Sequence, residues 1–271
     1  MSDVANAAES RFSQALGLLR EGRFAEAWPL YEARKALPRI SLLQPIADYP
    51  EWRGEDIGGR RLVVCAEQGF GDQIMWGRYL PLLTAAGAQV VVVTHPRLMR
   101  LFETLGYWTR PALTDQRLPA GDYWVHFGSV PLYHRAHAPP PAHYLDVDGA
   151  GGGVGVLAAA SAPGRSLREP YRSQLLALGR DLDPAVTGAF DFLDTARIIA
   201  GLDLVISVDT AVVNLAAALG RPTWALLPPE ADFRWGREGR SAWYPDVVQH
   251  RLNSPDDWRT VAESASALRR S

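Results

Sequence analysis

Residues 203–222 read DLVISVDTAVVNLAAALGRP, and this stretch decides the fold class. Segment 204–207 is short, apolar and β-branched, as is typical of a strand buried on both faces of a sheet. The polar pair Asp209 and Thr210 follows, and segment 211–219 then has the composition of a helix. A buried strand that ends in a polar turn opening a helix is typical of nucleotide-binding α/β folds.

The same alternation recurs along most of the chain. We expect strands at 61–66, 89–94, 122–127, 154–158, 204–207 and 223–227. We expect helices at 72–86, 96–105, 169–178, 193–201, 211–219 and 257–268. Strands that alternate with helices pair in parallel, because each crossover helix returns the chain to the same edge of the sheet. The sequence therefore predicts an α/β protein.

A glycine-rich run divides this pattern into two halves. Positions 149–153 read GAGGG, which we interpret as an interdomain hinge. We expect one Rossmann-like domain over 55–148 and a second over 149–271, facing each other across a ligand-binding cleft.

Residues 1–44 precede the alternating pattern. Apolar residues recur there at spacings of three and four and are interrupted at Glu21, Gly22 and Arg23, which predicts a short helical hairpin. Positions 21–31 resemble the second half of a tetratricopeptide repeat, and a plain helix pair explains them equally well, because such repeats need about three copies to bury a core. The hairpin is a possible site for a protein partner.

Composition excludes several classes of protein. The chain has 271 residues, of which 47% are hydrophobic, and its 28 Lys plus Arg nearly balance its 30 Asp plus Glu. This balance argues against a nucleic-acid partner or an anionic membrane surface. Cys65 is the one cysteine, which excludes a disulfide framework. No secretory signal and no stretch long enough to span a bilayer is recognisable, so we expect a cytoplasmic protein.

A glycine turn follows the first expected strand of the α/β region. Positions 67–72 read EQGFGD, and Gly69 and Gly71 allow backbone amides to approach a ligand closely. Asp72 is either a functional carboxylate or a helix cap. A dinucleotide motif needs a third glycine near Ile74 and an acid after the next strand, where positions 94–96 read THP. A Rossmann-type oxidoreductase is therefore a weaker alternative, and a P-loop ATPase is excluded.

The turn at Asp209 offers a candidate diphosphate site. Free backbone amides at Thr210 to Val212, with the positive end of the helix dipole, would suit a diphosphate. Asp209 would repel phosphate, so we expect it to accept backbone N–H bonds or to hold a ribose or sugar hydroxyl. Four arginines are candidates for the counter-charge: Arg165, Arg168, Arg221 and Arg234.

Other patterns have ordinary explanations. Asp146 and Asp148 form an Asp-x-Asp pattern beside the glycine run, where a solvated linker accounts for them. The histidines of the Pro-rich segment have irregular spacing and no thiolate partner, so we expect no metal site: His134, His137 and His143. Four aromatic residues either stack on a base or sugar or belong to the core: Trp224, Trp235, Trp243 and Tyr244.

Several motifs, taken together, resemble one family. They are EQGFGD at 67–72, RYLP at 78–81, DFLDTA at 191–196, VDTA at 208–211, LGRP at 219–222, DFRW at 232–235 and WYP at 243–245. In this order the chain resembles GT-B glycosyltransferases of the heptosyltransferase-like superfamily (family 9-like), in particular bacterial proteins that fuse tetratricopeptide repeats to that domain. The likeness spans most of residues 20–260.

The resemblance implies a function. The chain would move a sugar from a nucleotide-sugar donor to a protein or glycan acceptor, with inversion, without a metal and without a cofactor other than that substrate. Residues 55–148 would be the acceptor domain, with Asp72 as the general base, and residues 149–271 would be the nucleotide-sugar domain. The donor site would involve Gly69, Gly71, Asp209, Thr210, Ala211, Asn214, Arg168 and Arg234.

The chain departs from the family pattern in three places. Asn214 stands where the family commonly has a histidine, and asparagine cannot carry a positive charge. Segment 158–191 is shorter than expected, without an obvious full strand, and Leu157 is followed by three alanines where the family has a Trp-Ala/Ser-Gly turn. These departures favour an alternative, a catalytically inactive GT-B-like protein that binds nucleotide or acts as a scaffold through its N-terminal helices.

Overall fold

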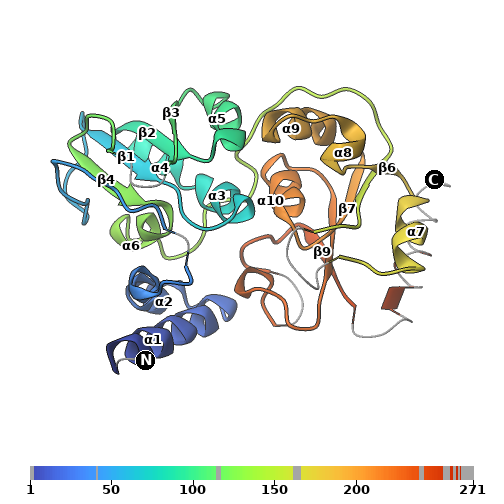
Figure 1. Ribbon diagram of the computed structural model, residues 1–271, viewed down its shortest axis with the longest axis horizontal. Helices are drawn as coiled ribbons and strands as arrows, with labels where there is room; N and C mark the ends of the chain where they lie inside the picture. The colour runs from blue at the N-terminus through green and yellow to red at the C-terminus, as the bar shows by residue number, and fades with distance from the viewer. Residues whose placement is uncertain are drawn as a thin grey trace. The chain divides into compact units, whose positions relative to one another are not determined.

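The computed structural model describes residues 3–40, 42–113, 117–160, 166–237, 241–252, 257–258, 261 and 263. Contacts divide the chain into two compact units, Met1–Ala142 (unit 1) and His143–Ser271 (unit 2). Each unit contains one parallel β-sheet with helices around it (Figure 1). The predicted α/β class with parallel sheets is confirmed.

The described part of unit 1 contains a four-stranded parallel sheet in the order β3-β2-β1-β4. Its strands are β1 (Arg61–Cys65), β2 (Gln89–Thr94), β3 (Trp108–Pro111) and β4 (Tyr123–His126). The helical elements after β1 are α3 (Phe70–Gly77), α4 (Leu80–Ala85), α5 (Pro96–Glu103), η2 (Phe127–Ser129) and α6 (Val130–Tyr133). Val63 of β1 pairs with Val91 of β2, and both are buried because Leu43, Ala47 and Tyr49 of the segment before β1 pack against this face of the sheet.

The helix expected at 72–86 is two helices in the structure. α3 begins earlier, at Phe70, because Gly69 is its N-cap and Asp72 accepts the Gly69 N–H. α3 ends at Gly77, and α4 begins at Leu80 with Pro81 in its first turn. Proline has no N–H and disfavours a helical residue before it, so it fits the start of a new helix better than the interior of one.

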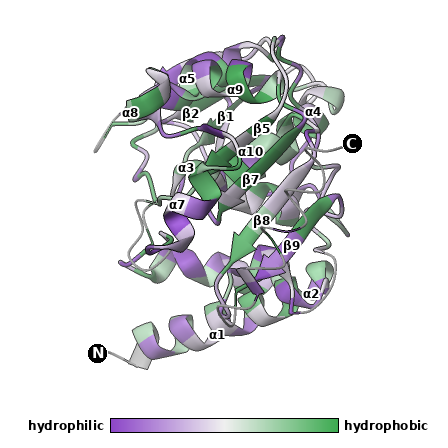
Figure 2. Cartoon of the chain, turned by 90° about the vertical axis from the view of Figure 1, so that its right-hand side faces the viewer, coloured by the Kyte–Doolittle hydropathy of each residue, from purple (hydrophilic) through white to green (hydrophobic). Residues whose placement is uncertain are grey.

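Two helices precede the sheet of unit 1. α1 (Asp3–Arg20) and α2 (Phe24–Tyr31) are joined by a turn in which Gly22 has a φ of 75°, and the short η1 (Glu32–Ala36) follows. Figure 2 shows polar and apolar residues alternating along α1. The ring centroids of the buried Trp28 and Tyr31 lie 6.2 and 5.8 Å from that of Trp76 in α3. The N-terminal helices therefore pack on the core of unit 1.

The described part of unit 2 contains a five-stranded parallel sheet in the order β6-β5-β7-β8-β9. Its strands are β5 (Val154–Leu157), β6 (Arg180–Asp181), β7 (Leu204–Val208), β8 (Thr223–Leu227) and β9 (Val247–Arg251). Its helices are α7 (Tyr171–Leu176), α8 (Pro184–Thr187), α9 (Phe192–Ala200), α10 (Ala211–Ala218) and η3 (Phe233–Trp235). Every residue of the central strand β7 is buried.

Three strands of the structure were not expected from the sequence. β3, β6 and β9 each lie at an edge of a sheet. Edge strands are buried less completely, so their sequences (WTRP, RD and VVQHR) lack the continuous apolar run of β1 or β7. The expected helix at 257–268 lies largely outside the described residues. Within this range the structure describes residues 257, 258, 261 and 263, and all four are helical.

The glycine run at 149–153 lies inside unit 2, and the division between the units falls at Ala142 and His143. Gly149 packs against the carboxyl end of α9, where an added Cβ would lie 2.5 Å from Gly201 N and 2.6 Å from Arg197 O. Close backbone approach, and not a hinge, explains this glycine. In the described part of the chain, no helix is both long enough and apolar enough to cross a membrane.

This packing predicts different effects for two neighbouring glycines. Gly149→Ala should lower the free energy of unfolding by about 1–3 kcal/mol, because the methyl group overpacks the contact with α9. Gly152→Ala is the matched control, since its Cβ would lie 3.4 Å from Asp203 Oδ2, an ordinary contact, and its cost should stay within about 0.5 kcal/mol. Urea unfolding of both variants measures the difference. Equal, small effects would show that the run is a flexible connector.

Candidate functional site

The chain order of the strands locates a candidate ligand site in each unit. In parallel sheets, ligands bind at the carboxyl ends of two adjacent strands whose connections run to opposite sides of the sheet. In unit 2 these strands are β5 and β7, because β6 pairs with the other edge of β5. The turn after β7 contains Asp209 and Thr210. The residues selected from sequence therefore lie at the expected position in the topology of unit 2.

Thr210 fixes the start of α10. Its backbone is extended, with φ −138° and ψ 178°, and its Oγ1 accepts the Val212 N–H at 3.2 Å. The Ser207 hydroxyl lies 3.2 Å from the same oxygen. The first turn of α10 begins at Ala211, where helical N–H groups and the helix dipole favour a negative charge.

Asp209 is 5% exposed and Oδ1 accepts a hydrogen bond from the Trp235 indole at 3.0 Å. The carboxylate thereby connects the carboxyl end of β7 to η3. We expected backbone N–H groups or a sugar hydroxyl as its partners; the structure shows an indole N–H at Oδ1, and a role in holding a hydroxyl stays a prediction. The aromatic pair behind it is buried, since Trp235 stacks on Tyr244 with ring centroids 5.2 Å apart.

Asn214 is the central residue of a buried polar cluster. Its Nδ2 donates to Thr210 O at 3.0 Å. Its Oδ1 accepts from Arg234 Nη1 at 3.2 Å and from the Tyr244 hydroxyl at 2.5 Å. With 2% exposure, the carboxamide is surrounded by protein groups. Asn214 therefore joins α10, η3 and the segment that carries Tyr244.

The candidate arginines differ in their surroundings. Arg234 is 7% exposed and its Nε donates to Asp232 Oδ1 at 2.9 Å, so its charge already has a carboxylate partner. Arg221 Nη1 donates to Ala200 O. Arg168 lies on an exposed segment before α7, and no contact described joins it to Asn214 or Asp209. Arg165 lies outside the described residues.

The aromatic candidates are core residues. Trp235, Trp243 and Tyr244 are each no more than 1% exposed, which confirms the core interpretation for these three. Trp224 is half-buried and its ring lies 4.9 Å from that of His250. Asp146 and Asp148 are exposed, and the described residues contain no group of three or more metal-binding side chains.

In unit 1, the adjacent strands whose connections run to opposite sides of the sheet are β1 and β4. Gly69, Gly71 and Asp72 follow β1, and Asp72 Oδ2 accepts the Gly69 N–H at 3.0 Å. Asp72 is half-buried and this bond closes the first turn of α3. The structure thus confirms the helix-cap interpretation of Asp72, and its role as a general base stays a prediction.

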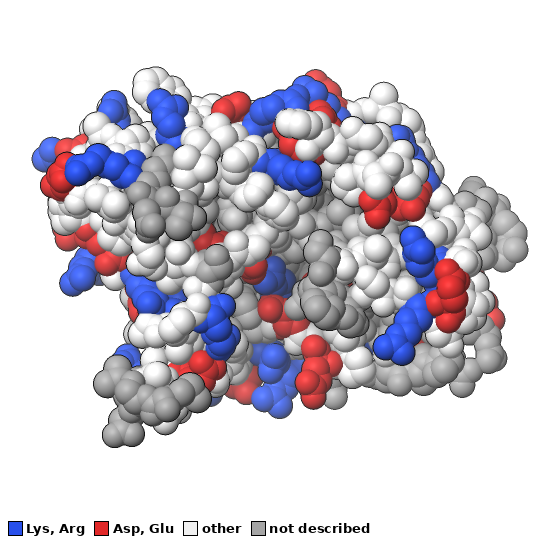
Figure 3. All heavy atoms as spheres, viewed as in Figure 1, with Lys and Arg blue, Asp and Glu red and all other residues white. Residues whose placement is uncertain are grey.

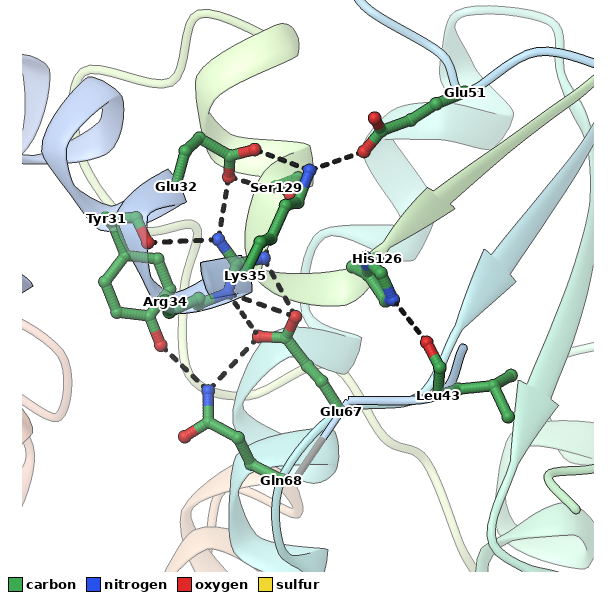
Figure 4. A network of polar contacts seen from close by, with 10 residues as sticks. All are labelled: Tyr31, Glu32, Arg34, Lys35, Leu43, Glu51, Glu67, Gln68, His126 and Ser129. Atoms are coloured by element: carbon green, nitrogen blue, oxygen red, sulfur yellow. Dashed lines mark hydrogen bonds and ion pairs between the residues drawn. The ribbon is translucent and has the colours of Figure 1, made fainter. Parts of the chain in front are cut away.

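A buried ion pair occupies the carboxyl end of β1 (Figure 4). Arg34 of η1 donates from Nη2 to Glu67 Oε2 at 2.8 Å and from Nε to both carboxylate oxygens at 3.2 Å. Both side chains are fully buried. The guanidinium also bonds the Ser129 hydroxyl and lies 4.6 Å from the centre of the Tyr31 ring. The N-terminal segment is therefore fastened to the sheet by a charged pair.

Neighbouring groups extend this network. Glu32 accepts from Arg34 Nη1 at 2.7 Å and from Ser129 at 2.8 Å, and Lys35 bridges Glu32 and Glu51. Burial acts to lower the pKa of Arg34, but the carboxylates of Glu67 and Glu32 outweigh it, so the net shift is upward. Gly128 makes room for the pair, because a Cβ there would overlap Glu67 Oε1.

The buried ion pair between Arg34 and Glu67 was not predicted from the sequence. Glu67 stands directly after a buried strand, a place where polar groups of sites collect, and that position was the available signal. Arg34 lies in a polar run, EARKA, that indicates nothing about burial. On the face in view in Figure 3, basic and acidic side chains of the described residues are interspersed, with no continuous basic area.

The fold and a sequence comparison support one superfamily for this chain. Each unit is a Rossmann-like α/β layer with polar turns and helix starts at the carboxyl ends of its strands. Residues 156–261, which include β7, Asn214 and Arg234, match the sequence profile of Glycosyltransferase family 9 (heptosyltransferase). The match supports the heptosyltransferase-like superfamily for this chain.

Solved structures show a similar fold. A family 9 glycosyl transferase from Veillonella parvula has a TM-score of 0.54 at 10% identity, covering 79% of this chain and 91% of that one. The iron-containing dodecameric glycosyltransferase TibC of enterotoxigenic E. coli has a TM-score of 0.51 at 12% identity, covering 76% of this chain and 64% of that one. At these identities the likeness concerns the fold.

A curated relative matches almost the whole chain. Protein FlbA of Caulobacter vibrioides is 27% identical over 328 residues, covering 96% of this chain and 54% of that protein. The chain thus spans about half the length of this relative. Since the matched stretch is longer than the chain itself, the relative has segments that this chain lacks.

The buried pair predicts a large effect on stability. Arg34→Met leaves Glu67 as an uncompensated buried carboxylate and should lower the free energy of unfolding by about 3–5 kcal/mol. Combining it with Glu67→Leu should recover most of this loss, because no charge is then buried. Urea unfolding measures both variants.

The matched control for this experiment is Arg39→Met. Arg39 pairs with Glu9, and both side chains are about half exposed, so its loss should change stability little. An equally small effect of Arg34→Met would contradict the importance of the buried pair.

His126 predicts a dependence of stability on pH. Its Nε2 donates to Leu43 O at 2.9 Å, and burial lowers the pKa of the ring despite the nearby carboxylate of Glu67. Above about pH 6.5 the ring is neutral in both states, and below it the unfolded state binds the proton first. The free energy of unfolding should fall as the pH drops below 6.5, by up to about 1.4 kcal/mol per unit.

Denaturant unfolding between pH 8 and pH 5 checks this. His126→Gln keeps an N–H donor for Leu43 O but does not titrate, so its slope below pH 6.5 should be smaller. His137→Gln replaces an exposed histidine of the same unit and should keep the original slope. Identical slopes in all three proteins would exclude His126 as the source.

Proposed function

We propose that this chain is a glycosyltransferase that moves a sugar from a nucleotide-sugar donor to a protein or glycan acceptor. One observation carries the proposal. The Asp209–Thr210 turn opens α10 beside the carboxyl end of β5, and it lies inside the stretch that matches the glycosyltransferase profile. The proposal includes inversion at the sugar carbon, no metal, no cofactor other than the donor, and a cytoplasmic location.

In this proposal the amino end of α10 holds the diphosphate of the donor. Backbone N–H groups at Thr210 and Ala211 and the helix dipole contribute about 0.3–1 kcal/mol per charge at an exposed site, while the Val212 N–H is already bonded to Thr210 Oγ1. Asp209, bound to Trp235, shapes the turn and does not contact phosphate. Arg234, which bonds Asn214 of α10, adds positive charge near this helix, although the carboxylate of Asp232 balances part of that charge. Arg168 would have to approach from its exposed segment.

Asp72 is the proposed general base in unit 1, at the glycine turn of Gly69 and Gly71. A carboxylate has about four lone-pair sites, so the capping bond from Gly69 is compatible with accepting a proton from an acceptor hydroxyl. The hydroxyl oxygen attacks the anomeric carbon while its proton passes to Asp72, and the nucleoside diphosphate departs with the bonding electrons.

A specific observation favours the alternative of an inactive nucleotide-binding or scaffold protein. The carboxamide of Asn214 is engaged by Thr210, Arg234 and Tyr244, and so it is committed to structure. Residue 214 itself carries no positive charge that could stabilise a leaving diphosphate. In this alternative the N-terminal helices α1 and α2 present the surface for a protein partner.

The first experiment identifies the donor. Melting curves are recorded with UDP, GDP, ADP and CMP, because a ligand that binds the native state raises the melting temperature. At a hundred times its dissociation constant, a bound nucleotide should add about 2.7 kcal/mol to the free energy of unfolding. The corresponding nucleotide sugars are then assayed for hydrolysis and transfer.

Asp72→Asn separates the active and inactive alternatives. Loss of the base should lower turnover by roughly 10²–10⁴-fold with donor binding retained, and stability should hold because asparagine also caps helices. Asp183→Asn is the control, since Asp183 also caps a helix outside the proposed site, as the N-cap residue of α8 that accepts the Ala185 N–H. Nucleotide binding without turnover in the unmutated protein would support the inactive alternative, and absence of both would contradict both.

A further inference from the structure

The ligand position between β1 and β4 of unit 1 is filled by the chain itself. Arg34 enters from the N-terminal segment and neutralises Glu67 at the carboxyl end of β1. Because this guanidinium is fully buried and bonded to Glu67, Glu32 and Ser129, it has no capacity for an incoming anion. A ligand of unit 1 must therefore bind beside this position.

A pocket of about 230 Å³ lies next to the filled position, at the carboxyl ends of β1, β2 and β3. Residues 42–44 of the N-terminal segment form one wall, and Gln68, Gln73 and His95 line the others. The wall is held in place, because Leu42 bridges Glu67 in an antiparallel manner and His126 bonds Leu43 O (Figure 4). The helical N-terminus and the sheet thus build this pocket together.

The described lining of the pocket contains no lysine or arginine, and its one carboxylate, Glu67, is paired with Arg34. Three neutral carboxamides line the pocket, those of Gln44, Gln68 and Gln73, and because Gln68 Nε2 already donates to the Tyr31 hydroxyl and to Glu67 Oε1, Gln68 can offer a ligand its Oε1. Gln73 is fixed, because its Oε1 accepts from the Thr94 hydroxyl at 2.7 Å.

His95 adds a neutral donor. Its Nδ1 accepts the Arg97 N–H at 3.1 Å, so the proton of the neutral ring is on Nε2. Burial, together with the charge of Arg97, lowers the pKa of His95, which keeps the ring uncharged at neutral pH. The pocket therefore offers hydrogen bonds without net charge.

We propose that this pocket holds one uncharged, hydroxyl-bearing sugar ring of the acceptor. The proposal rests on the proposed glycosyl transfer, and it specifies the acceptor as a neutral glycan. An anionic sugar or a phosphate would lose its hydration here without meeting a positive charge. The volume lies below the roughly 300–1,000 Å³ of pockets for drug-sized ligands, which suits a single ring.

A peptide acceptor fits the pocket less well. An extended peptide binds by adding a strand to free backbone groups of a sheet. At the carboxyl end of β1 this position is taken, since Leu42 already pairs with Glu67. The remaining groups are side-chain donors and acceptors, whose arrangement around a small volume suits ring hydroxyls.

Binding is tested on the whole chain without nucleotide, by saturation-transfer NMR. The neutral probes are the methyl glycosides of glucose, galactose, mannose and N-acetylglucosamine, and the anionic probe is the methyl glucuronide, which differs from the glucoside by one carboxylate. We expect at least one neutral glycoside to bind and the glucuronide to bind at least about tenfold more weakly. Equal or tighter binding of the glucuronide, no binding of any glycoside, or binding of a Ser/Thr/Asn peptide instead would overturn the proposal.

Substitutions in the pocket lining test whether the glycoside binds in this pocket. His95→Phe removes the Nε2 donor and should weaken the neutral glycoside by roughly 2- to 12-fold. Gln44→Arg changes an exposed residue and should shift the preference toward the glucuronide. Gln89→Ala is the matched control, because Gln89 is exposed at the opposite end of β2. An effect of His95→Phe no larger than that of the control would overturn the assignment.

These outcomes are separable from those of the proposed function. Donor turnover on a charged acceptor, without binding of neutral glycosides, contradicts the pocket alone. Binding of a neutral glycoside without turnover from any nucleotide sugar contradicts the transferase alone.

Discussion

Parallel pairing of strands is the constraint on which both units depend. It places the carboxyl ends of all strands at one edge of each sheet, together with the start of the following helix. In unit 2 that edge carries the Asp209–Thr210 turn, and in unit 1 it carries Glu67 and the glycine turn. The backbone alone thus determines where polar groups gather. Side chains from elsewhere in the chain then determine what each edge can bind.

The two edges use their polar groups differently. In unit 2, Asn214 and Asp209 bond groups of η3 and of the segment that follows it, which fixes the surroundings of α10. In unit 1, a cation from the N-terminal segment enters the edge itself and neutralises Glu67. Such a buried pair gives little net stability relative to an apolar pair, but it admits few alternative arrangements. The N-terminal segment is thereby held in one position on the sheet.

The central strands, the edge strand β4 and the turns of the site could be predicted from sequence, and the other edge strands could not. β1 and β7 are apolar throughout because both of their faces are covered, and this signal is local. β3, β6 and β9 lie at edges, so their sequences contain polar residues or only two positions. Asp72 and Thr210 were recognised as residues at helix starts because capping depends on near neighbours. The position of Glu67 after a buried strand indicates a site, but its pairing with Arg34 depends on contacts between distant segments and has no local signal.

Gly128 shows how tightly this arrangement constrains the chain. Its missing side chain leaves the space that the Glu67 carboxylate occupies, and the carboxylate in turn binds Arg34. A larger residue at position 128 would overlap the Glu67 carboxylate, so it cannot coexist with this ion pair unless the Glu67 side chain moves. Positions 34, 67 and 128, which lie far apart in the sequence, therefore constrain one another. We expect the residues at these three positions to covary among relatives.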